Sequence, residues 1–350
     1  MENAGVTALL IVRNEARNLP DCIDSIASSV DEIFVIDTGS DDGTADLARK
    51  AGARVSHFPW IGDFAAARNA AIEGCGTAWG FYIDADERLA PASRGLIRDS
   101  LDDSWFAADV LLRPKHNYTR CRLPRLFRID PRIRFEGAIH ETIIPSLERL
   151  PQHEAATGLT AIEIDHLGYE GDLTAKHHRN LPLLMRCIAD WPDRVYYRLH
   201  IAETLLGLDR PAEALAAGRA GIALAERLDA ARSRIDGAVI CQILAAHQLR
   251  QDDDPIGLIE TGLALHPGNH GLLLTLAQRH LKFGEAESAL GIARRLQEID
   301  PDALTPGPLA YDRDIFSRHA INTEIASLVK LGRKAEAASV LAGKARTLAP

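Results

Sequence analysis

The sequence predicts two regions of different structural class: an α/β domain with a mostly parallel sheet, residues 1–175, followed by an all-α helical-repeat domain, residues 176–350. Three observations support this division. Short apolar runs alternate with amphipathic stretches in the first half, which is the rhythm of β-α-β units. Alanine- and leucine-rich helical patterns without a convincing strand begin near Leu181. Three stretches of the second half share one local form.

The first elements follow from the spacing of their apolar residues. Val6–Val12 is apolar throughout except for Thr7, as expected of a strand covered on both faces. Residues 18–28 place Leu19, Cys22, Ile23 and Ile26 at helical spacing, and residues 32–37 return to an apolar run. A strand, a helix and a second strand are therefore predicted in that order.

The following elements are bounded by turn signals. The polar, glycine-containing residues 38–43 separate the second strand from a helix over residues 44–51. A third strand over 53–58, an alanine-rich helix over 64–73 and a fourth strand over 79–84 follow. Crossovers of this kind give an open parallel sheet, and ligands bind at the carboxyl ends of such strands.

The second half contains a recurring turn. In the stretches that begin at Asp209, Gly284 and Gly332, a turn residue is followed five positions later by alanine, which allows two antiparallel helices to approach closely. This form resembles the tetratricopeptide helix-turn-helix, with a generic helical bundle as the alternative. Asp209 stands where glycine is usual, and the proline-containing residues 300–314 interrupt the array.

Composition excludes several classes of protein. The 350 residues include 49 acidic and 40 basic side chains, a formal charge of −9 that disfavours a nucleic-acid-binding role. The five cysteines form no C-x-x-C pair, so neither a disulfide framework nor a zinc knuckle is predicted. We expect neither a signal peptide nor an integral membrane segment, and therefore a cytoplasmic protein.

Asp84 and Asp86 provide the strongest local sign of chemistry. They directly follow the fourth predicted strand, and side chains two residues apart on a strand point to the same side. Two carboxylates at a strand end can share one Mg²⁺ or Mn²⁺ ion with substrate phosphates. The alternative is a solvated acidic turn that caps the next helix.

Four further motifs accompany this acidic pair at predicted strand ends or close to them. They are Val12-Arg13-Asn14-Glu15, Val35 to Thr44, Asp63 to Asn69, and Phe135 to Glu141. With Asp165-His166-Leu167-Gly168-Tyr169, the chain over about Val6 to Tyr169 resembles family 2 glycosyltransferases of the Rossmann-like GT-A fold. The most similar subgroup includes bacterial lipopolysaccharide-core glycosyltransferases and bacteriocin S-glycosyltransferases.

The resemblance implies roles for individual residues. It assigns Asp37 to the nucleobase or ribose, with Asn14 and Glu15 nearby, although Thr38 replaces the second acid that is often found there. It assigns Asp84 to the nucleotide sugar, and Asp84, Asp86 and His166 to the metal. Arg68 can reach a diphosphate, and a surface salt bridge explains it almost as well.

The catalytic base remains open between two neighbours. Glu141 falls where GT-A enzymes commonly carry the base, but Asp is absent after it, so His140 is the alternative. Arg125, Arg128, Arg132 and Arg134 form a basic segment that can neutralise phosphates or an anionic acceptor, or simply form a solvated face.

The sequence thus predicts a metal-dependent, inverting, hexosyl-type glycosyltransferase. Its expected donor is a nucleotide sugar, with UDP as the first choice, and its expected acceptor is a peptide or protein, or a glycan. The helical domain is expected to bind the acceptor or to form a homodimer. The alternatives are an inactive GT-A/helical-repeat interaction protein and a sugar nucleotidyltransferase.

Overall fold

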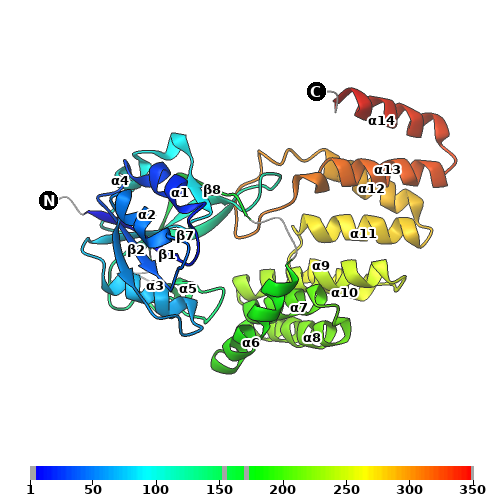
Figure 1. Ribbon diagram of the computed structural model, residues 1–350. Coiled ribbons are helices and arrows are strands. Elements are labelled where there is room, and N and C mark those ends of the chain that lie inside the picture. The colour runs from blue at the N-terminus through cyan, green and yellow to red at the C-terminus, as the bar shows by residue number, and fades with distance from the viewer. Residues whose placement is uncertain (1–4, 152–155, 169–172, 348–350) are drawn as a thin grey trace. The chain divides into compact units, whose positions relative to one another are not determined.

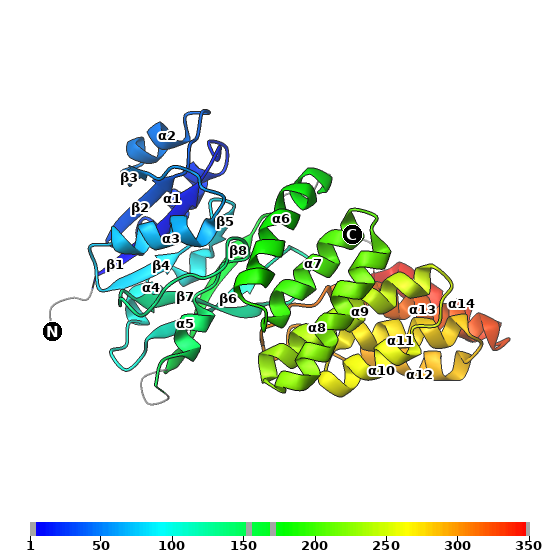
Figure 2. The ribbon, with the colours of Figure 1, turned by 90° about the horizontal axis from the view of Figure 1, so that it is seen from below.

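The computed structural model describes residues 5–151, 156–168 and 173–347. The chain forms two compact units (Figures 1 and 2): a first unit of residues 1–171 and 306–310, and a second unit of residues 172–305 and 311–350. It therefore passes between the units three times. Tyr169, the last residue of the fifth motif, lies outside the described residues.

The first unit is built on one eight-stranded sheet, with strand order β3-β2-β1-β4-β7-β6-β8-β5. The pairs among β1, β2, β3 and β4 are parallel, whereas β7 is antiparallel to both β4 and β6, and β5 is antiparallel to β8. β6 and β8 are parallel. The strands are β1 Val6–Val12, β2 Glu32–Asp37, β3 Arg54–His57, β4 Trp79–Tyr82, β5 Glu87–Leu89, β6 Ala107–Arg113, β7 Cys121–Arg128 and β8 Thr157–His166.

Helices cover both faces of this sheet (Figure 1). Buried residues of α1, α2 and α4 pack on one face, and those of α3 and α5 pack on the other. β1 is buried along nearly its whole length, which explains its apolar sequence. The helices are α1 Leu19–Ile26, α2 Thr44–Lys50, α3 Phe64–Glu73, α4 Leu96–Asp99 and α5 Ile144–Glu148, with a short 3₁₀ turn η1 Pro91–Ser93.

The described part of the second unit is helical, and consecutive helices pack against each other. Asp209, Gly284 and Gly332, the predicted turn residues, all adopt positive φ (55°, 92° and 75°) between paired helices. The helices are α6 Thr174–Asp190, α7 Val195–Gly207, α8 Pro211–Leu228, α9 Ala231–Arg250, α10 Ile256–Leu265, α11 His270–Lys282, α12 Ala286–Gln297, α13 Arg318–Lys330 and α14 Lys334–Thr347, with the 3₁₀ turn η2 Arg313–Ile315.

The small residues of these turns explain the close helix pairing. Ala214 and Ala289 are fully buried and Ala337 is 6% exposed. Asp229 (φ 49°, between α8 and α9) and Asp252 (φ 64°, between α9 and α10) adopt positive φ in two further turns, which the sequence analysis did not identify. Asp tolerates the left-handed region better than most residues do, so it can replace glycine at such positions.

The predicted fold class is confirmed. Two strands, Val6–Val12 and Glu32–Asp37, and the helix Phe64–Glu73 have the predicted bounds, and the other predicted elements differ by a few residues at their ends. Strands β5 to β8 were not predicted. They contain charged residues or a proline, and β5 has only three residues, so their sequences lack the continuous apolar run of β1.

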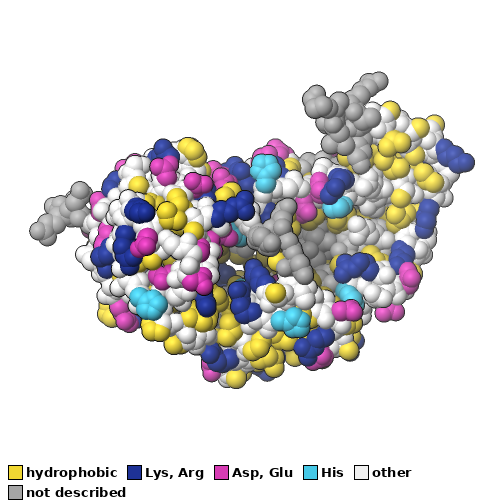
Figure 3. Space-filling view, in the orientation of Figure 1, with side chains coloured by type: hydrophobic (Ala, Val, Ile, Leu, Met, Phe, Trp, Pro, Cys, Tyr) yellow, Lys and Arg dark blue, Asp and Glu magenta, His cyan; other side chains and the backbone are white. Residues whose placement is uncertain are grey.

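The surface carries both signs of charge. Figure 3 shows Lys and Arg side chains interspersed with Asp and Glu on the face turned to the viewer. Among the described residues, no helix combines the length and apolarity needed to cross a bilayer.

Candidate functional site

The parallel strands bring the candidate residues to one edge of the sheet. Val12 at the end of β1 pairs with Asp37 at the end of β2, and β4 runs parallel to β1 on its other side. The segments after these strands contain Asn14 and Glu15, Asp37, and Asp84, respectively. This edge is where an open parallel sheet binds its ligands.

The loops after β1 and β2 are joined by hydrogen bonds. The backbone N–H of Asn14 donates to Oγ of Ser40 (2.9 Å), and the N–H of Asp41 donates to Oδ1 of Asn14 (3.0 Å). The N–H of Glu15 donates to Oγ1 of Thr44 (2.8 Å). The first two motifs therefore form one structural piece, and the side chain of Asn14 has a loop-building role in it.

Asp37 and Glu15 have different surroundings in this piece. Asp37 is 7% exposed, accepts from the N–H of Ser40 and lies 3.6 Å from Nδ1 of His57. The carboxylate of Glu15 accepts from Nδ2 of Asn18, and burial raises its pKa against that hydrogen bond. Asp37 and Glu15, two of the carboxylates predicted to lie near the nucleotide, are thus at the expected edge.

Helix α3 holds the segment that contains His140 and Glu141. The N–H of Phe64 donates to the carbonyl of Ala138 (3.0 Å), and the amide of Asn69 both donates to and accepts from the backbone of Phe135 (3.0 and 2.9 Å). Asp63 caps the helix by accepting from the N–H of Ala66. The motif Asp63 to Asn69 therefore packs directly against the motif Phe135 to Glu141.

Arg68 of α3 connects this segment to the strand-end acid. Its Nε donates to Oε1 of Glu141, and its Nη2 donates to Oδ1 of Asp84, each at 2.6 Å. Burial disfavours the charge of Arg68, but the two carboxylates outweigh it and raise the pKa of the guanidinium. In this structure the guanidinium is directed at two carboxylates and is buried, so these ion pairs are not the surface salt bridge that was the alternative, and the diphosphate contact stays a prediction.

A second arginine lies behind Asp84. Nη2 of Arg125 donates to Glu87 (2.7 Å), and Nη1 lies 3.7 Å from Oδ2 of Asp84. Burial raises the pKa of Glu87 to about 7, although Arg125 opposes this shift. For Asp84, Arg68 and Arg125 outweigh the effect of burial and hold the pKa of the carboxyl below its ordinary value. Glu87 also accepts from the backbone N–H of Asp84 (2.9 Å), so it fixes the turn after β4.

Sequence reasoning assigned no role to Glu87 and grouped Arg125 with its neighbours. The structure separates that basic segment. Arg128 pairs with Asp103, Arg132 pairs with Asp130, and Arg134 donates to backbone carbonyls. The signal for Arg125 was its position between apolar residues of β7, a strand that was not predicted and that also contains Arg122 and Arg128.

Asp86 and His166 form a pair that suits a divalent cation. Nδ1 of His166 lies 3.1 Å from the carbonyl oxygen of Pro114, which only accepts, so Nδ1 carries a proton. Nε2 lies 3.0 Å from Oδ2 of Asp86, and the contact raises the pKa of the histidine. When Nδ1 carries the proton of a neutral imidazole, Nε2 is a hydrogen-bond acceptor. It then faces another acceptor, the carboxylate of Asp86, so a proton or a cation must lie between the two atoms. The Pro114 contact orients the ring as metal-bound histidines are oriented.

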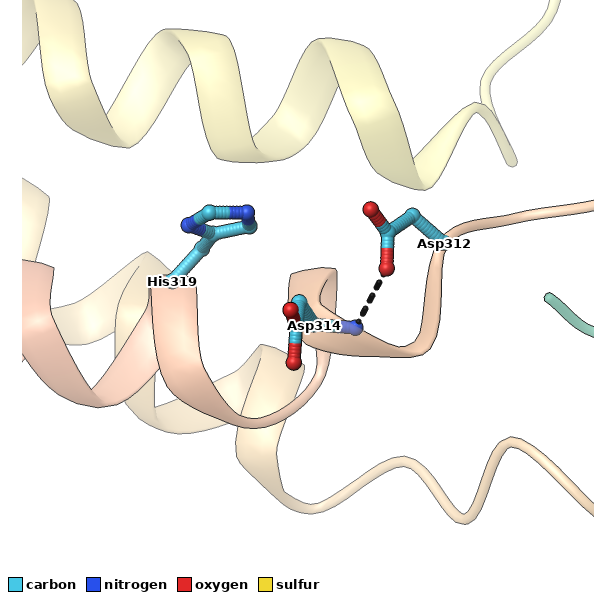
Figure 4. A group of neighbouring side chains, drawn as sticks. All are labelled: Asp312, Asp314 and His319. Carbon is cyan, nitrogen blue, oxygen red and sulfur yellow. Dashed lines mark hydrogen bonds between the residues drawn. The ribbon is translucent and has the colours of Figure 1, made fainter. Parts of the chain in front are cut away.

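Asp84 does not complete a three-residue cluster with this pair. Within the described ranges, one trio of His, Cys, Asp or Glu has ligand atoms all within 4.8 Å of one another, and it is Asp312, Asp314 and His319 (Figure 4). In that trio Asp312 accepts from the N–H of Asp314, and Asp314 pairs with Arg318 at 2.5 Å. Because these carboxylates already cap and neutralise their own turn, we assign no metal to them.

His140 has an unusual backbone conformation. Its φ of 52° lies in the left-handed region, which costs a histidine conformational energy that the surrounding contacts must offset. The N–H of Glu136 and that of Thr142 donate to each other's carbonyls across this turn, at 3.0 and 3.1 Å. The side chain of Glu141 is 11% exposed. The two candidate bases are thus adjacent in sequence but held differently.

The first unit is similar to known glycosyltransferases over the residues that carry these motifs. Residues 7–147 match the profile of "Glycosyl transferase family 2". The chain is 38% identical over 202 residues (55% of this chain) to a TPR repeat-containing protein of Synechococcus elongatus, and 35% identical over 156 residues (40%) to the lipopolysaccharide core biosynthesis glycosyltransferase LpsC of Rhizobium meliloti. It is 26% identical over 252 residues (68%) to the SPbeta prophage-derived glycosyltransferase SunS of Bacillus subtilis.

The matched parts span 50%, 57% and 58% of the Synechococcus protein, LpsC and SunS. Similar solved structures include mannosyl-3-phosphoglycerate synthase of Rubrobacter xylanophilus (18% identity, 53% of this chain and 73% of that chain, TM-score 0.42). Another is glucosyl-3-phosphoglycerate synthase of Mycobacterium tuberculosis with Mn²⁺ and UDP-glucose (17%, 52% and 79%, 0.40). Residues 7–147 thus match the model of glycosyl transferase family 2, and two of these similar relatives are named glycosyltransferases.

Proposed function

We propose that this chain is a metal-dependent, inverting glycosyltransferase that uses a nucleotide sugar, with UDP as the expected nucleotide. The observation that carries the proposal is the contiguity of the site. Hydrogen bonds join the β1 and β2 loops, α3 and the segment 135–141, and Asp86 and His166, while Arg68 joins Asp84 to Glu141. One edge of the sheet therefore carries groups suited to a nucleotide, to a cation and to proton transfer.

In the proposed donor site, Asp37 accepts hydrogen bonds from the base or ribose, and Asp86 and His166 would hold the cation. A divalent cation, Mn²⁺ or Mg²⁺, supplies positive charge for the departing diphosphate when it is bound. The side chain of Asp84 is 35% exposed, so it is accessible at the same edge.

In the proposed reaction, Glu141 takes the proton of the acceptor nucleophile as the nucleophile attacks the anomeric carbon of the donor. Direct displacement at that carbon inverts its configuration, and the nucleoside diphosphate leaves. A carboxylate in this position needs only hydrogen-bond reach to the nucleophile, and general bases of this type contribute about 10² to 10⁴ in rate. His140 is the second candidate for the proton acceptor.

The acceptor is proposed to be a peptide or protein, with a glycan as the alternative. The second unit has the paired-helix construction of repeat proteins, whose surfaces commonly bind extended chains. LpsC is described as a lipopolysaccharide core biosynthesis enzyme, which favours the glycan alternative. We also propose that the second unit forms a homodimer, because paired-helix repeats commonly build such interfaces.

The test is a screen of nucleotide sugars for slow donor hydrolysis with Mn²⁺ or Mg²⁺, in which water replaces the acceptor. We expect one donor to release free nucleoside diphosphate, and a chelator to abolish this release. In a parallel assay with a nucleoside triphosphate and a sugar 1-phosphate, release of pyrophosphate would instead identify a sugar nucleotidyltransferase. Absence of turnover and of nucleotide binding with every donor would favour the inactive interaction protein.

A further inference from the structure

Arg68 divides one edge of its guanidinium between two carboxylates. Nε and Nη2 are neighbouring donors on that edge, which ordinarily binds both oxygens of one carboxylate. Here one donor takes an oxygen of Glu141 and the other takes an oxygen of Asp84, both at 2.6 Å. The side chain of Arg68 is 8% exposed, so water offers it little competition.

Aromatic rings fix the guanidinium from its other sides. Its central carbon lies 4.9 Å from the ring centre of Tyr82 and 5.4 Å from that of Phe135. Tyr82 belongs to β4, and Phe135 begins the segment that α3 holds. The orientation of Arg68 is therefore set by the same two segments whose carboxylates it joins.

Two like charges are adjacent only because this cation lies against both. Without Arg68, the carboxylates of Asp84 and Glu141 would repel each other at close range in a partly buried site. Arg125 cannot replace it, because its Nη1 is 3.7 Å from Asp84 and its Nη2 is committed to Glu87. Nε and Nη1 of Arg125 are buried without a hydrogen-bond partner.

The exposures of the two carboxylates differ in a way that a simple structural ion pair would not require. The side chain of Asp84 is 35% exposed, whereas that of Glu141 is 11% exposed. Arg68 thus connects an accessible group at the strand end to a sheltered group 57 positions further along the chain. The contacts of Arg68 thus set the separation between the carboxylates of Asp84 and Glu141.

We propose that Arg68 is a positioning residue that holds Glu141 in register with the donor-binding edge at Asp84. The inference rests on the proposed function and deepens it. Arg68 is expected to act on turnover more than on donor affinity, because it places the proton acceptor relative to the donor. A lysine keeps the positive charge but cannot direct two hydrogen bonds along one planar edge.

The experiment compares Arg68→Lys with wild type and with Arg98→Lys, using the donor found in the hydrolysis screen. Arg98 is a matched control because it also bridges two segments of the first unit, through Asp31 and backbone carbonyls. We expect Arg68→Lys to lower kcat about tenfold to hundredfold, since misplacing a reacting group by about 1 Å has this effect. The donor KM and the Kd of UDP with Mn²⁺ should stay within about threefold, and Arg98→Lys should behave as wild type.

A second background separates positioning from a general loss of structure. In Glu141→Gln the basic carboxylate is gone, so Arg68→Lys should add little further loss of kcat if the two act together. Glu141→Asp keeps the charge but shortens the side chain away from Arg68, and it should reproduce the loss in kcat. It also tests the proposal if Arg68→Lys fails to fold, as judged by circular dichroism.

The outcomes are distinct. A kcat for Arg68→Lys within threefold of wild type, an effect confined to KM, or multiplicative losses in the double variant would overturn the positioning role. A folded wild-type protein that binds UDP and Mn²⁺ but consumes no nucleotide sugar would overturn the proposed function, and this inference with it.

Discussion

At the residue scale, the site is organised by ion pairs between arginine and carboxylate side chains. Arg68 forms ion pairs with Glu141 and Asp84, and Arg125 forms one with Glu87, whose side chain is 2% exposed. Breaking one partner of such a buried pair is costly, because the remaining charge has no solvent. The charged residues of this edge are therefore part of the fold as well as of the proposed chemistry.

Glu141→Gln tests the assignment of the base. It keeps an oxygen for the hydrogen bond from Arg68 and removes the basicity, so we expect turnover on a hydroxyl acceptor, or on water, to fall by about 10² to 10⁴. Binding of UDP with Mn²⁺ should be nearly unchanged. Calorimetry and donor consumption measured on the same samples check both statements.

His140→Ala is the companion variant. If it abolishes turnover while Glu141→Gln stays within a few-fold of wild type, the base is His140. A thiol acceptor would reduce the effect of Glu141→Gln, because a thiol is partly ionised near neutral pH.

At the element scale, α3 acts as a support for the segment 135–141. It meets that segment through Phe64 at its first turn, through Arg68 in its middle, and through Asn69. Phe64 and Arg68 lie at positions i and i+4, so they share one face of the helix, and Asn69 is the next residue along the chain. The sequence spacing of the Asp63–Asn69 motif is thus the spacing of a helix that docks a loop.

Asn69→Ala should loosen that loop. The N–H and C=O of Phe135 would lose their partner, which costs about 1 to 3 kcal/mol when the groups stay away from water. Glu73→Ala, at an exposed position of the same helix, should change the free energy of unfolding by less than about 0.5 kcal/mol. Urea unfolding of both variants measures the difference, and equal stability of the two would contradict the supporting role of α3.

Helix α9 carries a carboxyl group whose ionisation opposes folding. Burial raises the pKa of Asp236 to about 6, although Arg232, His200 and Arg194 act in the opposite direction. Because the folded pKa lies above the unfolded one, the folded state binds more protons between about pH 4 and pH 6, and stability falls as the pH rises through that window.

Asp236→Asn should therefore stabilise the helices near neutral pH. We expect a gain of about 1 to 3 kcal/mol at pH 7.5 and almost none at pH 4. Urea unfolding followed by circular dichroism at both pH values gives the comparison with wild type. A gain that is equal at both pH values would show that ionisation is not its cause.

At the scale of the whole molecule, the chain returns to the first unit between α12 and α13 of the second unit. Residues 306–310 belong to the first unit, where the carbonyl of Gly307 accepts from the N–H of Arg122 at the start of β7 (2.8 Å). Ala310 packs against the apolar core on the side of α1 and α2. The proline-containing interruption of the repeat pattern is explained by this return.

Ala310→Glu should destabilise the first unit, because it places a charge against that core. We expect a cost of about 1 to 3 kcal/mol and weaker UDP binding near the unfolding transition. Thr305→Glu, an exposed change that lies five residues earlier in the second unit, serves as the control and should be neutral. If the two variants unfold alike, the return segment does not support the first unit.

Much of the site could be predicted because its residues follow apolar strands. The run Val6–Val12 and the run Glu32–Asp37 locate the edge, and parallel pairing alone then brings Asn14, Asp37 and Asp84 to it. The left-handed turns at Gly284 and Gly332 were similarly visible, because glycine is the residue that adopts positive φ without strain.

The sequence by itself determined the two structural classes, the parallel strands and the candidate residues, since these depend on local periodicity and turn chemistry. Only the tertiary structure decided the partners: that Arg68 joins Asp84 to Glu141, that His166 faces Asp86, and that residues 306–310 complete the first unit. The physical reason is that these contacts join residues far apart in the sequence: Arg68 and Asp84 are 16 positions apart, and Asp86 and His166 are 80 positions apart. Their geometry is fixed by antiparallel strands and buried charge pairs, which leave no periodic pattern in the chain.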